Sequence, residues 1–205
     1  MGGYQEAMIR ERKHIRLKGY DYCQAGEYFV TICSRAREHL FGEIVDGNMI
    51  LNVIGTTANE CWTEIPSHFP NVEIDAFVVM PNHVHGIIRI MDDPGRDVQL
   101  NIPTDKYHSK ISPKAGSLAV IVRTYKAAVT TICRKHGIDG FGWQSGFYEH
   151  VIRNDRSLAR IREYIANNPL HWTVDAENSN FQGKGGDDRP DRLATTRDGF
   201  PSTNK

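Results

Sequence analysis

The sequence predicts an α+β fold built on an antiparallel sheet of about five strands. Segments rich in β-branched and aromatic residues arrive in pairs separated by short turns, as strands of hairpins do. Segments with helical periodicity stand apart from one another, as separate crossings. The expected order along the chain is β-β-β-α-β-β-loop-α-β-α, which favours antiparallel pairing because neighbouring strands are joined by tight turns.

Six segments are expected to form strands. The strongest signal is the pair VEIDAFVVM and HVHGIIRIM, because both are dense in β formers and a tight Pro81-Asn82 turn joins them. The run EYFVTICS predicts the first strand, and FGEIVDGNMILN predicts a hairpin that turns at Asp46-Gly47. The run FYEHVI predicts one more strand late in the chain.

Three segments predict helices. Apolar residues recur at helical spacing over residues 53–68, where prolines close the segment. Residues 117–136 begin with a serine cap, carry an apolar stripe and end before Gly137. The third helix, SLARIREYIANN, follows a cap at Asn154-Asp155 and stops at Pro169. Helices packed on the sheet then predict a ferredoxin- or RRM-like sandwich.

Length and composition indicate one compact domain. The chain has 205 residues, of which 40% are hydrophobic and 24% charged, and these values exclude wholesale disorder and collagen-like or coiled-coil architectures. We expect the domain to span residues 1–172, with a long loop over residues 92–116. Residues 173–205 are polar and lack periodicity, so we expect a disordered tail there, outside the fold.

Neither a membrane span nor a signal peptide is apparent. No stretch approaches the roughly 18 consecutive apolar residues that cross a bilayer, and the polar start of the chain has no apolar core. The four cysteines form no CxxC pair, which argues against a zinc knuckle and a secreted disulfide framework. We therefore expect a cytoplasmic protein with reduced thiols and no membrane partner.

The formal net charge is zero, which would ordinarily count against a nucleic-acid partner. The distribution of charge softens this objection, because the first 18 residues carry five basic side chains against two acidic ones, a net charge of 5 − 2 = +3. This segment is either a solvated terminus or an arm that grips phosphates. The candidates for such contacts are Arg10, Arg12, Lys13 and Arg16.

Two short patterns carry possible chemistry. In His83-Val84-His85, at the start of a predicted strand, the alternation of side chains brings both imidazoles to one face. Tyr164 and Asn168 are four residues apart, so they share one face of the last helix. Each pattern alone also fits a structural role, since Tyr164 can complete an apolar stripe and Asn168 can cap the helix.

Together, these residues resemble a known family. The segments that carry the resemblance lie between about residues 12 and 172 and are VMPNHVH at 79–85, WQ at 143–144, EH at 149–150, IR at 152–153, YI at 164–165 and NP at 168–169. The chain resembles the His-hydrophobic-His single-tyrosine transposases, and within them the REP-associated tyrosine transposases of bacteria. It departs from them at Gly146, where members commonly carry Arg, and in the length of its 92–116 loop.

The resemblance implies that His83 and His85 bind a divalent metal, Mg²⁺ or Mn²⁺, that Asn168 completes the metal site, and that Tyr164 is the nucleophile. It implies a DNA transposase and single-strand endonuclease that cleaves and rejoins hairpin-bearing single-stranded DNA through a 5′-phosphotyrosine intermediate. It also implies a bacterial protein that associates with the nucleoid when bound to DNA. Whether the protein is a monomer or a homodimer stays open.

Other side chains are candidates for DNA contacts, each with a structural alternative. Trp143 can stack on an unpaired base or pack in the core. His150 can face the catalytic site or make a structural hydrogen bond. Lys126 and Arg153 can touch phosphates or stay solvated.

Two rival functions remain at this point. One is a non-enzymatic single-stranded nucleic-acid-binding protein whose sheet displays aromatics. The other is a nuclease that uses a metal-bound water and leaves Tyr164 as packing.

Overall fold

The computed structural model describes residues 20–92, 116–175 and 178, and in these the central element is a four-stranded antiparallel sheet. Its strand order is β4-β5-β1-β6. The bounds are β1 Gly26–Cys33, β4 Val72–Met80, β5 His83–Ile90 and β6 Tyr148–Ile152. Strand β5 therefore lies between β4 and β1, each of which pairs with it antiparallel.

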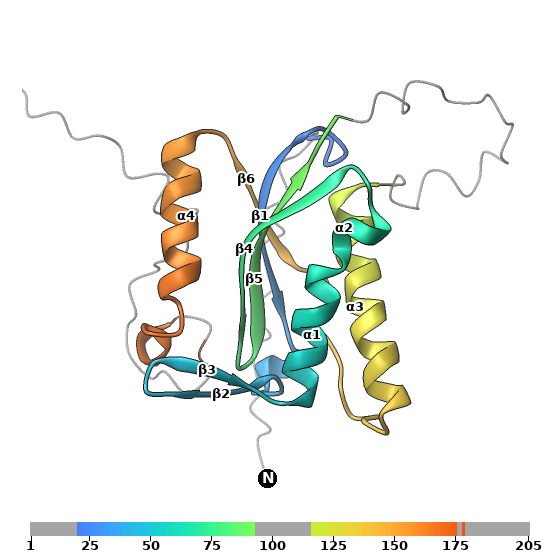
Figure 1. Cartoon of the computed structure of the whole chain (residues 1–205), viewed down its shortest axis with the longest axis vertical. Coiled ribbons are helices and arrows are strands. Elements are labelled where there is room, and N and C mark those ends of the chain that lie inside the picture. The colour runs from blue at the N-terminus through green and yellow to red at the C-terminus, as the bar shows by residue number, and fades with distance from the viewer. Residues whose placement is uncertain (1–19, 93–115, 176–177, 179–205) are drawn as a thin grey trace, which may run out of the picture.

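A separate hairpin accounts for the difference from the expected sheet of about five strands. Strands β2, Gly42–Val45, and β3, Asn48–Leu51, pair with each other in a second, two-stranded sheet. Their turn holds Asp46 at φ 50° and Gly47 at φ 74°, as a type I′ turn requires. The α+β class and the order of elements are as the sequence predicts, and the hairpin packs below the main sheet (Figure 1).

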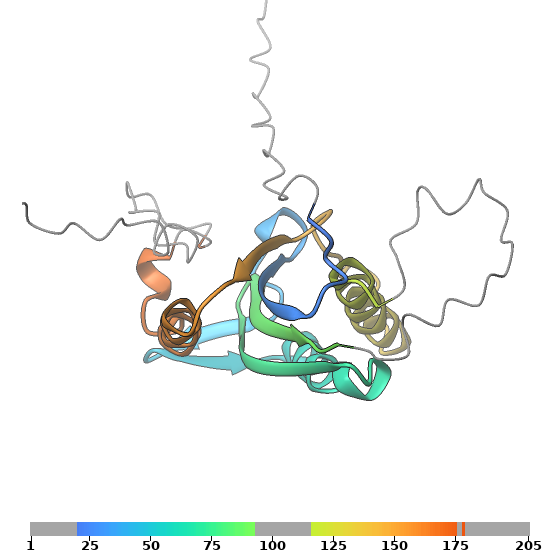
Figure 2. The ribbon, with the colours of Figure 1, turned by 90° about the horizontal axis from the view of Figure 1, so that it is seen from above.

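Helices cover both faces of the sheet (Figures 1 and 2). Helices α1, Val53–Thr63, α2, Ile65–His68, and α3, Leu118–Lys135, lie on one side, and α4, Asp155–Asn167, lies on the other. The chain thus forms three layers, one more than a sandwich whose helices share a single face. The segment expected as one helix over 53–68 divides at Glu64 because Pro66, at the start of α2, cannot donate to the helical ladder.

The layers enclose two apolar clusters, one on each side of the sheet. Tyr28, Val30 and Ile32 of β1 point into the larger cluster, which α1 and α3 complete. Phe29 points the opposite way and packs with Ile87 and the apolar stripe of α4. Strand β1 is buried on both faces, which explains why its sequence is a nearly continuous apolar run instead of an alternating one.

A glycine in the central strand lets α1 approach the sheet. A Cβ atom added at Gly86 would overlap the ring of Trp62, which is fully buried. The Trp62 ring stacks on Phe77, with 5.8 Å between centroids, and meets Tyr125 edge-on at 5.1 Å. Gly86 therefore fixes how β5 sits against the helical layer, one residue beyond His85.

Some expectations fall on residues outside the described part of the chain. These are the basic N-terminal segment, residues 93–115 of the expected loop and residues 176–177 and 179–205 of the expected tail. Two short 3-10 turns lie within the described part, η1 Arg35–Arg37 and η2 Trp172–Val174. None of the described helices is both long enough and apolar enough to cross a membrane.

Candidate active site

Two buried histidines begin the central strand. The Pro81-Asn82 turn delivers His83 and His85 to the first and third positions of β5, and both point to the α4 side. Their ring centroids are 4.2 Å apart, and their exposed fractions are 0% and 2%. Val84, between them, packs in the larger cluster on the opposite face. The side chains of this strand therefore alternate between the two faces of the sheet, as the sequence predicts.

Asn82 determines which nitrogen of His83 carries its lone pair. The Asn82 Nδ2 donates to the carbonyl of Arg37 at 3.2 Å, so its Oδ1 is the acceptor that lies 2.8 Å from His83 Nδ1. His83 Nδ1 must then be the protonated nitrogen. Its Nε2 keeps a lone pair, and this atom is buried without a hydrogen-bond partner among the described residues.

His85 lies between a threonine and the tyrosine. Thr31, its cross-strand partner on β1, places Oγ1 2.9 Å from His85 Nδ1. On the other side of the ring, His85 Nε2 is 3.2 Å from the Tyr164 hydroxyl. A hydroxyl that accepts from Nδ1 leaves the Nε2 lone pair directed toward the tyrosine and the space beside it.

Helix α4 positions Tyr164 through its cap and its apolar stripe. Asn154 caps the helix by accepting from the Ser157 amide at 2.9 Å. Leu158, Ile161 and Ile165 are buried against Phe29 and Ile87, which sets the rotation of the helix. Tyr164 is partly buried at the margin of this cluster, so its ring packs while its hydroxyl reaches His85.

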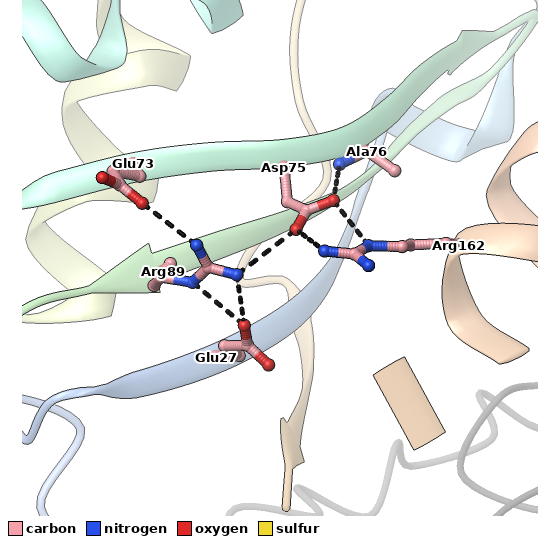
Figure 3. Close-up of polar contacts among 6 residues, drawn as sticks. All are labelled: Glu27, Glu73, Asp75, Ala76, Arg89 and Arg162. Carbon is pink, nitrogen blue, oxygen red and sulfur yellow. Dashed lines mark hydrogen bonds and ion pairs between the residues drawn. The ribbon is translucent and has the colours of Figure 1, made fainter. Parts of the chain in front are cut away.

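Ion pairs tie the exposed side of α4 to the sheet (Figure 3). Arg162 donates two hydrogen bonds to the Asp75 carboxylate, at 2.9 and 2.6 Å, and these bonds lower the pKa of Asp75. Arg89 lies 3.6 Å from the same carboxylate and also pairs with Glu27 and Glu73. Arg162 precedes Tyr164 by two residues, so this network fixes the helix near its functional side chain.

The end of α4 brings an amide and a carboxylate to the histidines. Asn168, 2% exposed, follows the last residue of α4 and donates from Nδ2 to Asp175 Oδ2 at 2.8 Å. Its Oδ1 is buried and has no hydrogen-bond partner within standard geometry among the described residues. Turn η2 brings Asp175 back to this point, and its Trp172 ring lies 6.0 Å from the ring of His83.

This group of side chains suits a divalent metal. Ligand atoms of His83, His85 and Asp175 all lie within 4.8 Å of one another. The buried, unpartnered His83 Nε2 and Asn168 Oδ1 add two atoms that a cation would satisfy. Nitrogen and oxygen donors of this kind fit a hard or borderline divalent ion.

Burial keeps both imidazoles in the neutral form that binds metals. Desolvation lowers the pKa of His85 to about 3 and is also the main cause that lowers the pKa of His83 well below its usual value. The charges of His85 and Arg37 lower the pKa of His83 further, whereas the neighbouring Asn168 amide acts in the opposite direction. Both histidines are therefore ready to act as ligands at neutral pH.

The described DNA-contact candidates lie in different surroundings. Trp143 packs against Phe41, Tyr125 and Phe141 and donates from Nε1 to the Lys126 carbonyl, so it is partly buried against the edge of the larger cluster.

Lys126 donates to the carbonyls of Gln144 and Gly146 at 2.7 and 2.9 Å, and thereby braces the segment that precedes β6. His150 pairs with Phe29 across β1 and β6 and so lies on the α4 side of the sheet, and Arg153 is exposed just beyond β6. Arg10, Arg12, Lys13 and Arg16 lie outside the described residues.

Sequence reasoning missed three residues of this site. Asn82 lies next to His83 in the VMPNHVH segment, but the sequence predicted only that it belongs to a turn. Thr31 enters through strand pairing, and no local pattern reveals which residue lies opposite His85. Asp175 lies in the stretch assigned to the tail, where the lack of periodicity concealed a short 3-10 turn that returns to the site.

Comparisons with known proteins give relatives of two kinds. No family model matches the sequence. A Haemophilus influenzae protein described as uncharacterized is 43% identical over 171 residues, which cover 82% of this chain and 94% of that protein. A second protein of that organism, described as "Putative REP-associated tyrosine transposase", is 23% identical over 153 residues, 73% of each chain.

Two solved structures are also similar. One is a REP-associated tyrosine transposase bound to a REP hairpin, with 21% identity and a TM-score of 0.49 over 84% of this chain and 74% of that one. The other is described as a "putative transposase" from Deinococcus radiodurans, with 18% identity and a TM-score of 0.40 over 74% of this chain and 97% of that one. The chain thus belongs to the same family as the uncharacterized Haemophilus protein, and its sequence is also similar to that of the Haemophilus protein described as a REP-associated tyrosine transposase, in line with the predicted resemblance.

Proposed function

We propose that this protein is a DNA transposase that acts as a single-strand endonuclease and strand transferase, with Tyr164 as its nucleophile. One observation carries the proposal: the Tyr164 hydroxyl lies 3.2 Å from Nε2 of His85, whose ring centroid is 4.2 Å from that of His83. A phenol next to a candidate metal site is an arrangement that can activate tyrosine as a nucleophile for phosphodiester transfer. The relative described as a REP-associated tyrosine transposase supports the same reading.

The reaction is a transesterification at phosphorus. The Tyr164 oxygen attacks the scissile phosphate, forming a phosphotyrosine bond to the 5′ phosphate of the fragment downstream of the break. The bond from phosphorus to the 3′ oxygen breaks, the phenolic proton is released to solvent and the leaving oxygen takes up a proton. Attack by a second 3′ hydroxyl reverses these steps and rejoins the strand, so no external energy source is needed.

Three described side chains are proposed to hold Mg²⁺ or Mn²⁺. They are His83 and His85, through their Nε2 atoms, and Asn168, through Oδ1. When bound, the ion supplies Lewis-acid stabilisation of charge on the phosphate. The chain itself contributes orientation, because Asn82 and Thr31 fix the imidazoles and α4 fixes the tyrosine. Most ligand atoms are buried, which strengthens their electrostatic effect on a bound phosphate.

The proposed substrate is single-stranded DNA that carries a hairpin. This proposal rests on the resemblance and on the solved transposase that binds a REP hairpin. DNA contacts by Arg10, Arg12, Lys13, Arg16, Lys126, Trp143, His150 and Arg153 stay predictions. His150 and Arg153 are the better placed among those described, since the Trp143 ring already packs against three aromatic rings and Lys126 already donates to two carbonyls.

The architecture favours an enzyme over a passive binder of single strands. An RRM-like binder displays aromatics on an open sheet face, where bases stack. Here α1 and α3 cover one face and α4 packs on the other, so the described aromatics of β1 are buried.

The experiment that tests the proposal compares single-atom and ligand variants. Purified full-length protein is incubated with hairpin-bearing single strands and Mn²⁺, and products are resolved on a denaturing gel. Tyr164→Phe should bind DNA but not cleave, because phenylalanine keeps the ring but lacks the oxygen that attacks the phosphate. Tyr148→Phe, which removes the hydroxyl from another partly buried tyrosine on the same face, is the matched control and should cleave.

Metal dependence supplies the second arm. EDTA should stop cleavage by the wild type without unfolding it, and His85→Ala should lose activity that excess Mn²⁺ partly restores. No concentration of Mn²⁺ should rescue Tyr164→Phe. Wild-type nicking by Tyr164→Phe would instead establish a nuclease that uses metal-bound water and leaves Tyr164 as packing.

A further inference from the structure

We infer that Asp175 is an anionic ligand of the metal site and that it holds Asn168 in its ligand orientation. The inference deepens the metal site on which the proposed function rests. It assigns a role to a residue outside the His-hydrophobic-His and tyrosine-helix motifs. It also makes the segment after α4 part of the active site.

The position of Asp175 is the first argument. The chain leaves α4 at Asn168, passes through η2 and returns, so that Asp175 is 8% exposed and its amide bonds back to the Trp172 carbonyl at 3.3 Å. Its carboxylate lies within 4.8 Å of ligand atoms of both His83 and His85. Ligands that share one ion lie about 2.0–2.2 Å from it and up to about twice that from each other, so only a small closure is needed.

The orientation of Asn168 is the second argument. Its Nδ2 donates to Asp175 Oδ2 at 2.8 Å, and an amide has its nitrogen and oxygen on opposite sides of one carbon. The hydrogen bond therefore directs Oδ1 away from Asp175, to a buried position where no described residue hydrogen-bonds to it. His83 Nε2 is likewise buried without a hydrogen-bond partner in the part of the chain that the structure describes. Two such atoms near one carboxylate call for a cation.

The charge of the site is the third argument. Two neutral imidazoles and a neutral amide bring no negative charge to a divalent ion. Mg²⁺ and Mn²⁺ are hard cations that prefer carboxylate oxygens. Asp175 supplies a carboxylate at the one position in the described chain where it can reach both histidines. A metal bound there would connect β5 to the segment beyond α4.

The test measures metal binding without DNA, so that it does not depend on catalysis. Free Mn²⁺ is followed by electron paramagnetic resonance while full-length protein is titrated. Asp175→Asn keeps an oxygen that can accept from Asn168 but removes the charge, and it should bind Mn²⁺ about tenfold more weakly or worse. Glu163→Gln removes an exposed charge from α4 and is the matched control, expected to bind as the wild type does.

A charge-conserving variant covers the possibility that Asp175→Asn alters the fold. Asp175→Glu restores the carboxylate and should bind Mn²⁺ more tightly than Asp175→Asn. Metal-free melting temperatures of the variants are compared in parallel. Equal affinities of the wild type and Asp175→Asn, or of the two Asp175 variants, would overturn the inference, as would a wild type that binds no Mn²⁺.

Failure of this inference differs from failure of the proposed function. If Asp175→Asn binds Mn²⁺ normally while Tyr164→Phe abolishes cleavage, Asp175 is not a ligand and the nucleophile stands. If Asp175→Asn loses Mn²⁺ while Tyr164→Phe still cleaves, the ligand assignment stands and the tyrosine mechanism is wrong.

Discussion

Replacing Thr31 with Val should weaken both the fold and the metal site, because it removes the hydrogen bond that orients His85. Thr31 Oγ1 lies 2.9 Å from His85 Nδ1, and the two residues are 6% and 2% exposed. Valine has nearly the same shape as threonine, so the substitution leaves no cavity. The only loss is the hydroxyl, which leaves a buried ring nitrogen without its partner.

The size of the effect follows from that burial. A buried polar atom left without a partner costs about 1–3 kcal/mol, which should appear as a lower free energy of unfolding. Metal affinity should fall as well, because nothing then favours the tautomer whose Nε2 lone pair is available. Removing the hydrogen bond that orients a metal-binding histidine typically lowers affinity by about 10–100-fold.

The assay pairs urea denaturation with Mn²⁺ titration, and Thr57→Val is the control. Thr57 is 7% exposed, but its hydroxyl donates at 2.9 Å to the Val53 carbonyl within α1. Helix α1 lies on the other side of the sheet from the histidines. Thr57→Val should leave Mn²⁺ affinity unchanged. If Thr31→Val binds Mn²⁺ as tightly as the wild type, the assigned orientation of His85 is wrong.

Three further predictions follow from the packing and charges around the site. Gly86→Ala should lower the free energy of unfolding in urea by about 1–3 kcal/mol, because its new methyl group overlaps the Trp62 ring, and an unchanged midpoint would contradict this packing. Asp75→Asn should slow cleavage, more at low than at high ionic strength, because it releases Arg162 and the outer side of α4; equal rates at every salt concentration would show that the ion pair does not position the helix. Lowering the pH from 7 to 4 should destabilise the metal-free protein: burial lowers the folded pKa of His85 to about 3, so the unfolded chain binds a proton below about pH 6.5 that the folded chain does not. Urea midpoints that stay constant across this window would show that His85 is not buried in solution.

The sequence predicts the elements of this fold well because the signals are local. Alternation in β5, the helical stripe of α4 and the Asp46-Gly47 turn each depend on neighbours along the chain, and all three are present. The number of strands in the main sheet and the faces that the helices cover depend on contacts between distant segments. The β2–β3 hairpin shows this, since its strand signals are correct but do not reveal that it stands apart.

In the candidate site, too, some residues could be predicted from local patterns, whereas others depend on contacts between distant segments. His83 and His85 share one face of the strand because side chains alternate along it. Tyr164 and Asn168 lie on one face of the helix because they are four residues apart. The sequence could therefore predict both pairs. That the two pairs meet is a tertiary fact, now visible in the 3.2 Å contact between His85 and Tyr164. Thr31 and Asp175 reach the site from other parts of the chain, and no pattern within their own segments marks them.

The central claim is that Tyr164 becomes covalently joined to DNA, and identification of the joined residue tests it most directly. Hairpin-bearing single strands labelled at either end are incubated with the protein and Mn²⁺, and the adduct is digested and sequenced by mass spectrometry. We predict that the 3′-labelled fragment is attached through its 5′ phosphate to the peptide that contains Tyr164, while the 5′-labelled fragment is released with a free 3′ hydroxyl. Cleavage without any protein-linked product, or an adduct on another residue, would contradict the account.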